Sequence, residues 1–336
     1  MGKLAAKRAT VKLLAAALCV LAFSSAVFAA DKTYKIKVGN TTDPDHPLNV
    51  CLEEAAKLMR EKSGGRLDAT VFPSSQLGSL RTITEGLQMG TIEMGTQSPG
   101  GLASFMPLYG VLELPYLYSS HADAYKIVDG PIGNELDEMF RKKTGVRVLG
   151  YVLNFHRNVT NSKRPIKHPE DFKGLKLRVP ETKSIMDTIA LLGATPIPMG
   201  FGEVYTSLSQ GIIDGQENPV SVIWASKLYE VQKYLSMTGH AYSPAVVTIS
   251  DQFYESLPED LQKIIVESVA EVRASTREAV ERQDQDLVTQ LKEKGMEINE
   301  VDVTEFRKLM EPLYKAFVDE NGPEAAEFLK RIRESL

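Results

Sequence analysis

Short apolar runs alternate along the chain with segments in which apolar residues recur every three or four positions. Runs of about four to eight residues are typical of strands, and the longer spacing is typical of amphipathic helices. We expect strands at residues 34–39, 67–72, 92–96, 146–153, 175–179, 195–198, 212–214 and 245–250. Strands that alternate with helices predict an α/β protein built on a mainly parallel sheet.

The helical spacing predicts helices that connect these strands. We expect them around residues 52–59 and at residues 79–89, 122–143, 203–210 and 261–295. A capping box at Ser256 and Glu259, with Pro258 in the first turn, is expected to begin the last helix, and Gly295 to end it. A helix of that length could lie along two lobes.

Chain length favours two lobes over one, because about 300 residues exceed one comfortable core. The polar residues 154–162 follow a strand and mark the expected change of lobe. We therefore predict an amino-terminal lobe at residues 31–153, a carboxy-terminal lobe at 154–250, and a long helix and terminal helices at 251–336 that pack across both. Open α/β sheets bind ligands at the carboxyl ends of their strands, so a cleft between the lobes is the expected site.

The first 30 residues are typical of a cleavable export signal. Basic residues precede an apolar run at residues 13–23, and small residues follow at the spacing of a cleavage site. The mature chain is expected to begin at Ala30 or Asp31. The apolar run is shorter than the roughly 20 residues that cross a bilayer, so we predict release into the periplasm.

The charge of the mature chain narrows the classes of partner. Without the export signal, 35 basic residues face 44 acidic ones, a net charge near −9. Such a surface disfavours nucleic acid and anionic membranes as partners. An anionic ligand would then need local arginines that overcome the overall negative field.

Arg178 is the first candidate for such a role. Alternation along residues 175–179 puts Arg178 on the face opposite Leu177 and Val179, and Pro180 ends the strand. A guanidinium at a strand end suits bidentate capture of a carboxylate or another oxyanion. A strand-end arginine can equally be an ion-paired surface residue, so residue type alone leaves its role open.

Two further side chains lie near expected strand ends. Asn218 precedes Pro219, which biases its backbone to an extended conformation. Phe201 lies between two glycines in a loop, where its ring needs an apolar partner or a ligand. Alone, the first is also a turn signal and the second is also a core residue.

Several segments in a fixed order resemble the dicarboxylate-binding (DctP) type of solute-binding protein, which serves tripartite ATP-independent periplasmic (TRAP) transporters. The similar segments lie at residues 73–78, 113–116, 161–166, 169–174, 174–180, 198–205, 214–219 and 229–234. Several motifs in one order are a far more specific signal than any single short pattern. The resemblance implies a two-lobed type II periplasmic-binding-protein fold, with a ligand cleft between the lobes and a long helix that spans both.

The resemblance also implies roles for particular residues. Arg178 would form the main salt bridge to the acid group of the ligand, Asn218 would add a hydrogen bond, and Phe201 would pack on the ligand. Arg157 matches the second arginine of the family. In the amino-terminal lobe, sialic-acid-binding relatives carry acidic residues where this chain has Leu80 and Ser98, so a sugar acid of that kind is disfavoured. The side chains there that would suit a smaller polar anion are Asn40, Thr41, Gln97 and Ser98.

The implied function is capture of a small organic anion by hinge closure and its delivery to two integral membrane subunits. A four-carbon dicarboxylate, a hydroxy or keto acid, and a small sulfonate such as isethionate all remain open. A periplasmic sensing subunit and, less favoured, an enzyme acting on an organic acid are the alternatives.

Sequence motifs of enzymes are absent. The chain contains no Gly-x-Ser-x-Gly, no His-Glu-x-x-His and no phosphate loop, so we expect no catalytic residues, no metal and no cofactor. The histidines lack metal-ligand spacing and are expected in turns or at the surface; they are His46, His121, His156, His168 and His240. Only His156, beside Arg157, invites a functional interpretation.

Overall fold

The computed structural model describes residues 32–336, except for the side chains of residues 153–155 and 279–285. The predicted export signal at residues 1–30, and the predicted start of the mature chain, lie outside the described residues. Residues 35–336 form one compact unit. Within residues 32–336, none of the helices combines the length and apolar character needed to cross a membrane.

Nine strands pair into one mixed sheet in the described part of the chain, in the order β2-β1-β3-β8-β4-β7-β5-β6 with β9 beside β8. The strands are β1 (Tyr34–Gly39), β2 (Leu67–Phe72), β3 (Met94–Gln97), β4 (Val146–Asn161), β5 (Lys176–Val179), β6 (Thr195–Pro198), β7 (Gly215–Asn218), β8 (Tyr234–Ser250) and β9 (Glu297–Glu300). Parallel pairs lie towards both ends of the sheet, whereas the central strands β8 and β4 run antiparallel to each other and to β3 and β7; β9 runs parallel to β8. The expected α/β class is confirmed, with two long antiparallel strands at its centre.

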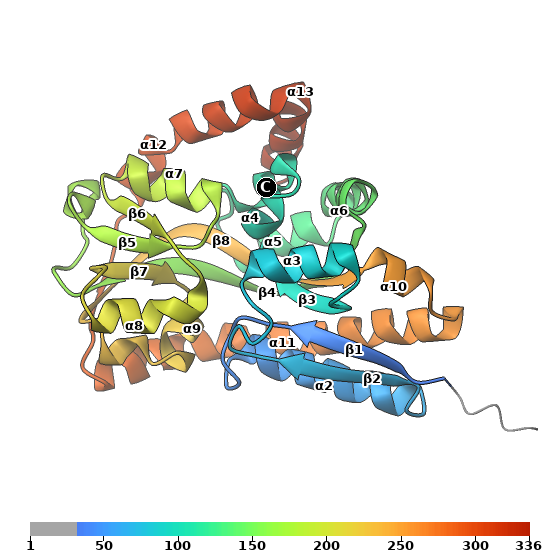
Figure 1. The fold of residues 1–336 in the computed structure, drawn as a ribbon. Helices are drawn as coiled ribbons and strands as arrows, with labels where there is room; N and C mark the ends of the chain where they lie inside the picture. The colour runs from blue at the N-terminus through green and yellow to red at the C-terminus, as the bar shows by residue number, and fades with distance from the viewer. Residues whose placement is uncertain (1–31) are drawn as a thin grey trace, which may run out of the picture. The chain divides into compact units, whose positions relative to one another are not determined.

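The long strands β4 and β8 connect two lobes (Figure 1). On one side lie β1, β2 and β3, which we call the amino-terminal lobe; on the other lie β5, β6 and β7, the carboxy-terminal lobe. The predicted lobe boundary at 153/154 falls inside β4, which is continuous through the polar residues 154–161. The polarity of these residues was taken to mark a change of lobe, but the strand continues through them, and several of their side chains are buried.

Helices cover both lobes. They are α2 (Pro47–Lys62), α3 (Leu80–Met89), α4 (Pro99–Ala103), α5 (His121–Val128), α6 (Pro131–Thr144), α7 (Lys183–Leu191), α8 (Val204–Ser209), α9 (Val220–Ala225), α10 (Asp251–Glu255), α11 (Glu259–Glu293), α12 (Thr304–Leu309) and α13 (Glu311–Ser335), with 3₁₀ turns η1 (Pro107–Glu113), η2 (Pro169–Phe172), η3 (Phe201–Glu203) and η4 (Leu228–Glu230).

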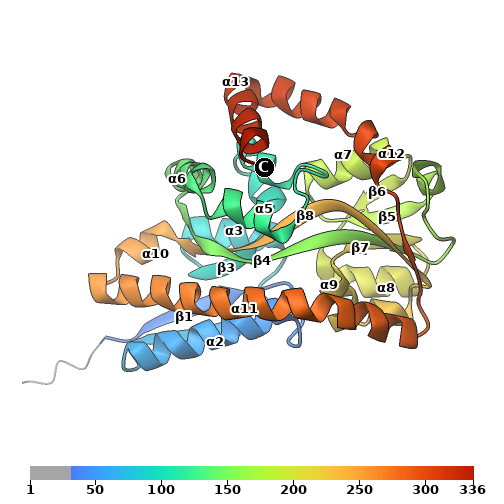
Figure 2. The same cartoon turned by 180° about the vertical axis from the view of Figure 1, so that it is seen from behind.

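The predicted long helix is confirmed as α11, which passes along both lobes in Figures 1 and 2. It contacts α2 in the amino-terminal lobe and α9 in the carboxy-terminal lobe. Its stripe of apolar residues, including Leu261 and Ile265, is buried as the periodicity predicts. Gly295 follows its end with a φ of +96°, a conformation that glycine adopts without strain.

Several local predictions were wrong. The capping box at Ser256 and Glu259 does not form, because α11 begins after Pro258 and the Ser256 hydroxyl donates to the carbonyl of Phe253. The expected helix at 122–143 is two helices, since Pro131 cannot continue the first and instead begins α6. The strands expected at 92–96 and 212–214 lie two or three residues later, at β3 and β7, whose residues are buried on both faces.

Candidate ligand-binding site

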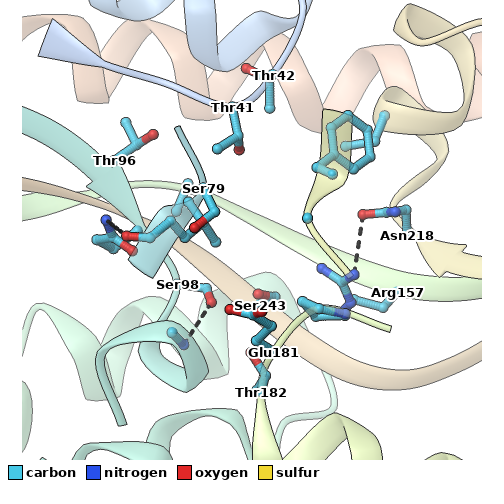
Figure 3. A pocket seen from close by; sticks show the side chains of 18 of the residues that line it. Thr41, Thr42, Ser79, Thr96, Ser98, Arg157, Glu181, Thr182, Asn218 and Ser243 are labelled. Carbon is cyan, nitrogen blue, oxygen red and sulfur yellow. Dashed lines mark hydrogen bonds between the residues drawn. The ribbon is translucent and has the colours of Figure 1, made fainter. Parts of the chain in front are cut away.

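A pocket of about 150 Å³ lies where the lobes meet, and both lobes and the two long strands line it. Figure 3 shows hydroxyl groups from both lobes gathered around it. The hydroxyl side chains that line it are Thr41, Thr42, Ser79, Thr96, Ser98, Ser104, Thr182 and Ser243. The arginines are Arg81, Arg157 and Arg178, and the acids are Glu113 and Glu181.

Arg178 is held at the pocket by its place in β5. Leu177 and Val179 point into the core, so the alternation of the strand turns Arg178 the other way, as predicted. Its Nε and Nη2 donate to the carbonyl of Met199 at 3.1 and 2.8 Å, and its guanidinium lies 5.7 Å from the ring centre of Phe201. The backbone and the ring therefore fix the direction of the guanidinium.

The charge of Arg178 is not balanced by a contacting acid. It is only 4% exposed, and among the described side chains no carboxylate lies within ion-pair distance of it. Burial lowers the pKa of its guanidinium to about 10, which leaves it protonated at neutral pH. A buried cation without a carboxylate partner is a strong site for an anion.

Arg157 is also buried at the pocket, but it already has an acidic partner. Its Nη2 donates to Oε1 of Glu217 at 2.8 Å, its Nε contacts the other oxygen, and Nη2 also reaches the backbone carbonyl of Glu217 at 2.9 Å. The register of β4 against β7 brings the two residues together. In this register Asn158, the residue after Arg157, faces Asn218, the residue after Glu217. The sequence analysis missed Glu217, although it lies in the motif beside Asn218.

Glu217 is fully buried between Arg157 and His240, whose Nε2 lies 3.1 Å from Oε2. Burial by itself would raise the pKa of Glu217, yet Arg157 and His240 hold it at about 2. The contact with Glu217 likewise raises the pKa of Arg157 against the opposing effect of burial. The ion pair is therefore charged at neutral pH, and its net charge is close to zero.

Asn218 ends β7 at the pocket wall. Its Oδ1 accepts from Nη2 of Arg157 at 3.1 Å, the dashed contact in Figure 3, and its Nδ2 donates to Gln216. These bonds fix the orientation of the amide and leave one amide hydrogen for another acceptor. Arg157, Arg178, Phe201 and Asn218, which the sequence predicted together, all line the pocket. Their contact with a ligand stays a prediction.

The candidate residues in the amino-terminal lobe do not all line the pocket. Thr41, Gln97 and Ser98 line the pocket, and the hydroxyl of Ser98 accepts from the amide of Gly101 at the start of α4. Asn40 does not line it. Asn40 is fully buried behind the wall, where its amide bonds to Thr42 and to neighbouring side chains, so it supports the wall instead of facing the pocket.

Glu113 is one of the pocket residues that the sequence analysis did not single out, although it begins one of the recognised segments. It ends η1, is 2% exposed, and accepts a hydrogen bond of 2.6 Å from the amide of Gly100. Burial raises the pKa of its carboxyl, while Arg157, Ser243 and the Gly100 amide oppose that effect. The sequence signal that could have found it is its place at the start of the recognised segment 113–116.

The expectation that histidines lie in turns or at the surface holds for His46, which lies in the turn before α2, and was wrong for His240. His46 caps α2 and is 1% exposed, and burial lowers its pKa to about 3. His240 is fully buried against Glu217. His156 packs edge-on against Tyr242, with ring centres 4.4 Å apart, and does not line the pocket.

The two lobes touch each other at both sides of the pocket. Asp43, after β1, accepts hydrogen bonds from Ser74 of its own lobe and from Ser226 after α9. On the other side, Gly100 packs so closely against Thr182 that an added Cβ would lie 2.2 Å from the threonine methyl group. The lobes are therefore in a closed arrangement around the pocket.

Comparisons with known proteins agree with this architecture. The model of the DctP family, described as bacterial extracellular solute-binding protein, family 7, matches residues 38–321. The 2,3-diketo-L-gulonate-binding periplasmic protein YiaO of Escherichia coli K12 is 34% identical over 93% of this chain and 94% of its own length.

Solved structures extend the likeness to three dimensions. A TRAP periplasmic solute-binding protein from Polaromonas sp. JS666, bound to D-erythronate, is 36% identical with a TM-score of 0.84, over 90% of this chain and 98% of that one. Another, from Sulfurospirillum deleyianum with bound succinate, is 27% identical with a TM-score of 0.85, over 91% of this chain and all of that one. The chain thus belongs to the DctP family of TRAP transporter solute-binding proteins.

Proposed function

We propose that this chain is the periplasmic solute-binding protein of a TRAP transporter, that it captures a small organic anion through Arg178, and that it delivers the closed complex to two integral membrane subunits. The observation that carries the proposal is the buried guanidinium of Arg178, which faces the pocket without a carboxylate partner among the described side chains. Small organic acids bound to relatives of the family support the same ligand class.

The net charge at the pocket favours a ligand with one acid group over a ligand with two. Arg157 is neutralised by Glu217, and Arg81 is a solvated residue whose side chain is 56% exposed and pairs with Glu85 at 3.2 Å. Among the described side chains, Arg178 is therefore the one buried positive charge at the pocket that a ligand can neutralise. An anionic head on Arg178, with Asn218 and Arg157 beside it, could be a carboxylate or a sulfonate.

The test is the affinity of the purified mature chain for organic anions before and after substitution of Arg178. A thermal-shift screen of carboxylates and sulfonates identifies a ligand, because a ligand that binds only the native state raises the melting temperature. Arg178→Ala is expected to keep the fold. Its binding free energy for that ligand should be less favourable by about 2 to 5 kcal/mol, which calorimetry would measure as an affinity roughly 30-fold to several thousand-fold lower.

Arg60→Ala is the matched control, because Arg60 lies on the exposed surface of α2 in a pair with Asp68. It should bind the ligand as the wild-type chain does. Equal affinities for wild type and Arg178→Ala would refute capture by Arg178. For the export signal, mass spectrometry of the periplasmic fraction should find a chain that begins at Ala30 or Asp31, and a chain retained in the cytoplasm would contradict the proposed location.

A further inference from the structure

The carboxyl group of Glu113 is buried where the two lobes meet. The residue is 2% exposed, and its Oε2 accepts a hydrogen bond of 2.6 Å from the amide of Gly100. A Cβ atom added to Gly100 would lie 2.1 Å from this oxygen and 2.2 Å from the methyl group of Thr182, which belongs to the carboxy-terminal lobe. Groups from both lobes therefore enclose the carboxyl group, so closure of the lobes contributes to its burial.

The elements packed against Glu113 carry groups that act on its charge. Burial has the largest effect and raises the pKa of its carboxyl group, and the charge of Glu217 in β7 adds to this rise. Arg157 in β4, Ser243 in β8 and the Gly100 amide in α4 oppose the rise without cancelling it. The closed pocket thus disfavours the ionised form of Glu113, although Arg157 lies beside it.

The net charge of the pocket depends on whether Glu113 carries a proton. Arg157 and Glu217 neutralise each other, whereas Arg178 has no contacting acid among the described side chains. If Glu113 is ionised, these four groups carry no net charge, and a bound anion makes the pocket negative. If Glu113 is protonated, the same anion makes the pocket neutral, which burial favours. Glu181, the other acid at the pocket, is exposed, so solvent screens its charge.

Protonation leaves the hydrogen bonds of Glu113 intact. One oxygen continues to accept from the Gly100 amide, while the hydroxyl of the protonated carboxyl group can donate to the oxygen of Ser243. Tyr118, a titratable neighbour, stays neutral, because burial and the charges of Tyr314 and Glu113 raise the pKa of its hydroxyl. The proton can therefore enter without a rearrangement of the pocket.

We infer that Glu113 is a proton-binding site coupled to ligand capture, which takes up a proton from solvent when the lobes close around an anion on Arg178. The inference rests on the proposed function, since it takes Arg178 as the anchor of the anion. The coupling is reciprocal, so the proton and the anion each strengthen the binding of the other. The affinity for the anion should therefore fall as the pH rises and the proton becomes scarcer.

Calorimetry between pH 5 and pH 8 tests the coupling. The probes are D-erythronate, pantoate, pyruvate and isethionate, because each is a monoanion throughout this range, and the tightest binder of the four is used. Its affinity for the wild-type chain should fall about 5- to 50-fold from pH 5 to pH 8. An affinity that is constant, or that rises with pH, would overturn the inference.

The heat of binding counts the protons directly. At the pH where the affinity falls most steeply, the heat is measured in two buffers that differ in ionisation enthalpy. The difference between the two heats gives the number of protons taken up, which should be roughly 0.3 to 1 for each bound anion. Release of protons, or no exchange at all, would contradict the inference.

A substitution assigns the proton to Glu113. Glu113→Gln keeps an oxygen for the Gly100 amide and resembles the protonated carboxyl group, so it should take up no proton and bind the probe equally well from pH 5 to pH 8. Glu54→Gln, on the exposed face of α2, is the control and should keep the wild-type uptake. Uptake that persists in Glu113→Gln would place the proton elsewhere, for example on His240, and would overturn the inference.

If Glu113→Gln does not fold, Ser243→Ala decides. The contact with Ser243 lowers the pKa of Glu113, so its removal should move the fall in affinity to higher pH. A fall that stays at the wild-type pH, or moves to lower pH, would contradict the role of Glu113.

The outcomes separate this inference from the proposed function. If none of the four anions binds, or if Arg178→Ala binds them as wild type does, the proposed function fails and the inference fails with it. If the anions bind through Arg178 without proton uptake, only the inference fails.

Discussion

The two walls of the pocket differ in charge and in how the chain builds them. The carboxy-terminal wall comprises Arg157, Arg178, Phe201 and Asn218, and the amino-terminal wall comprises Thr41, Ser79, Gln97, Ser98 and Glu113. The first carries guanidinium and amide donors, whereas the second carries hydroxyl groups and the buried carboxyl group of Glu113. The two walls therefore present different chemical groups to the pocket.

The carboxy-terminal wall depends on the ion pair between Arg157 and Glu217, and its removal has the largest expected effect. Glu217→Ala leaves a buried guanidinium without its partner, which should lower the free energy of unfolding by about 3 to 5 kcal/mol. Urea unfolding measures the change. Glu230→Ala is a suitable control because Glu230 lies outside the pocket. Equal losses in both variants would show that the pair does not support this wall.

The same pair makes stability depend on pH in a defined direction. Arg157 and His240 hold the pKa of buried Glu217 at about 2, below its ordinary value of 4.5. A lowered pKa in the folded state stabilises the protein above the unfolded pKa, and this contribution is lost as the pH falls from about 4.5 towards 2. Unfolding free energy should fall more steeply between pH 5 and pH 3 for wild type than for Glu217→Gln. Parallel slopes would contradict the assignment.

The substitution Gly100→Ala tests the close contact between Gly100 and Thr182, where the two lobes meet. An added Cβ would lie 2.1 Å from Oε2 of Glu113 and 2.2 Å from the Thr182 methyl group, so one of these buried groups must move. Overpacking costs about 1 to 3 kcal/mol, and the ligand should bind roughly 5- to 150-fold more weakly by calorimetry.

A control for this substitution is Gly110→Ala, in η1 of the same lobe, where the nearest contact of the added Cβ is 3.3 Å. It should reduce ligand affinity far less than Gly100→Ala does. If the two variants lose affinity equally, close packing between Gly100 and Thr182 is not what aligns the two walls.

The smallest effect is expected at the opposite edge of the pocket. Ser226→Ala removes the hydrogen bond from the carboxy-terminal lobe to Asp43 and should weaken ligand binding by about 0.5 to 1.5 kcal/mol, or roughly 2- to 12-fold. Ser74→Ala removes the other partner of Asp43, which lies in the same lobe as Asp43. An equal loss in the Ser74 variant would show that the bond between the lobes has no special role in closure.

The two walls of the pocket also differ in how well the sequence predicted them. Arg178, Phe201 and Asn218 lie within about 40 residues at strand ends, so local alternation and motif order brought them together. Gln97 was among the predicted candidates and lines the pocket, whereas Glu113, from a separate segment, also lines it and was not singled out. Glu217 was missed because its partnership with Arg157 depends on the register of β4 against β7, which no local pattern encodes.

The fold was predicted best where burial and periodicity agree. The apolar stripe of α11 and the strand at β5 were found, because each has one face in the core. The strand predicted at 146–153 is the first half of β4, which continues to Asn161, and β7 begins three residues later than predicted. In both cases the residues that were missed are polar and lack the apolar pattern of a strand. These errors in the strands lie around the pocket, where polar groups are buried, whereas the helix divided at Pro131 and the missing capping box at Ser256 lie elsewhere.

The most direct test of the account is a crystal structure of the chain with the organic anion that binds most tightly in the thermal-shift screen. The account predicts the acid group of this anion within hydrogen-bond distance of the Arg178 guanidinium and of Asn218. A ligand whose carboxylate lies on the amino-terminal wall, with Arg178 in contact with no ligand atom, would contradict it.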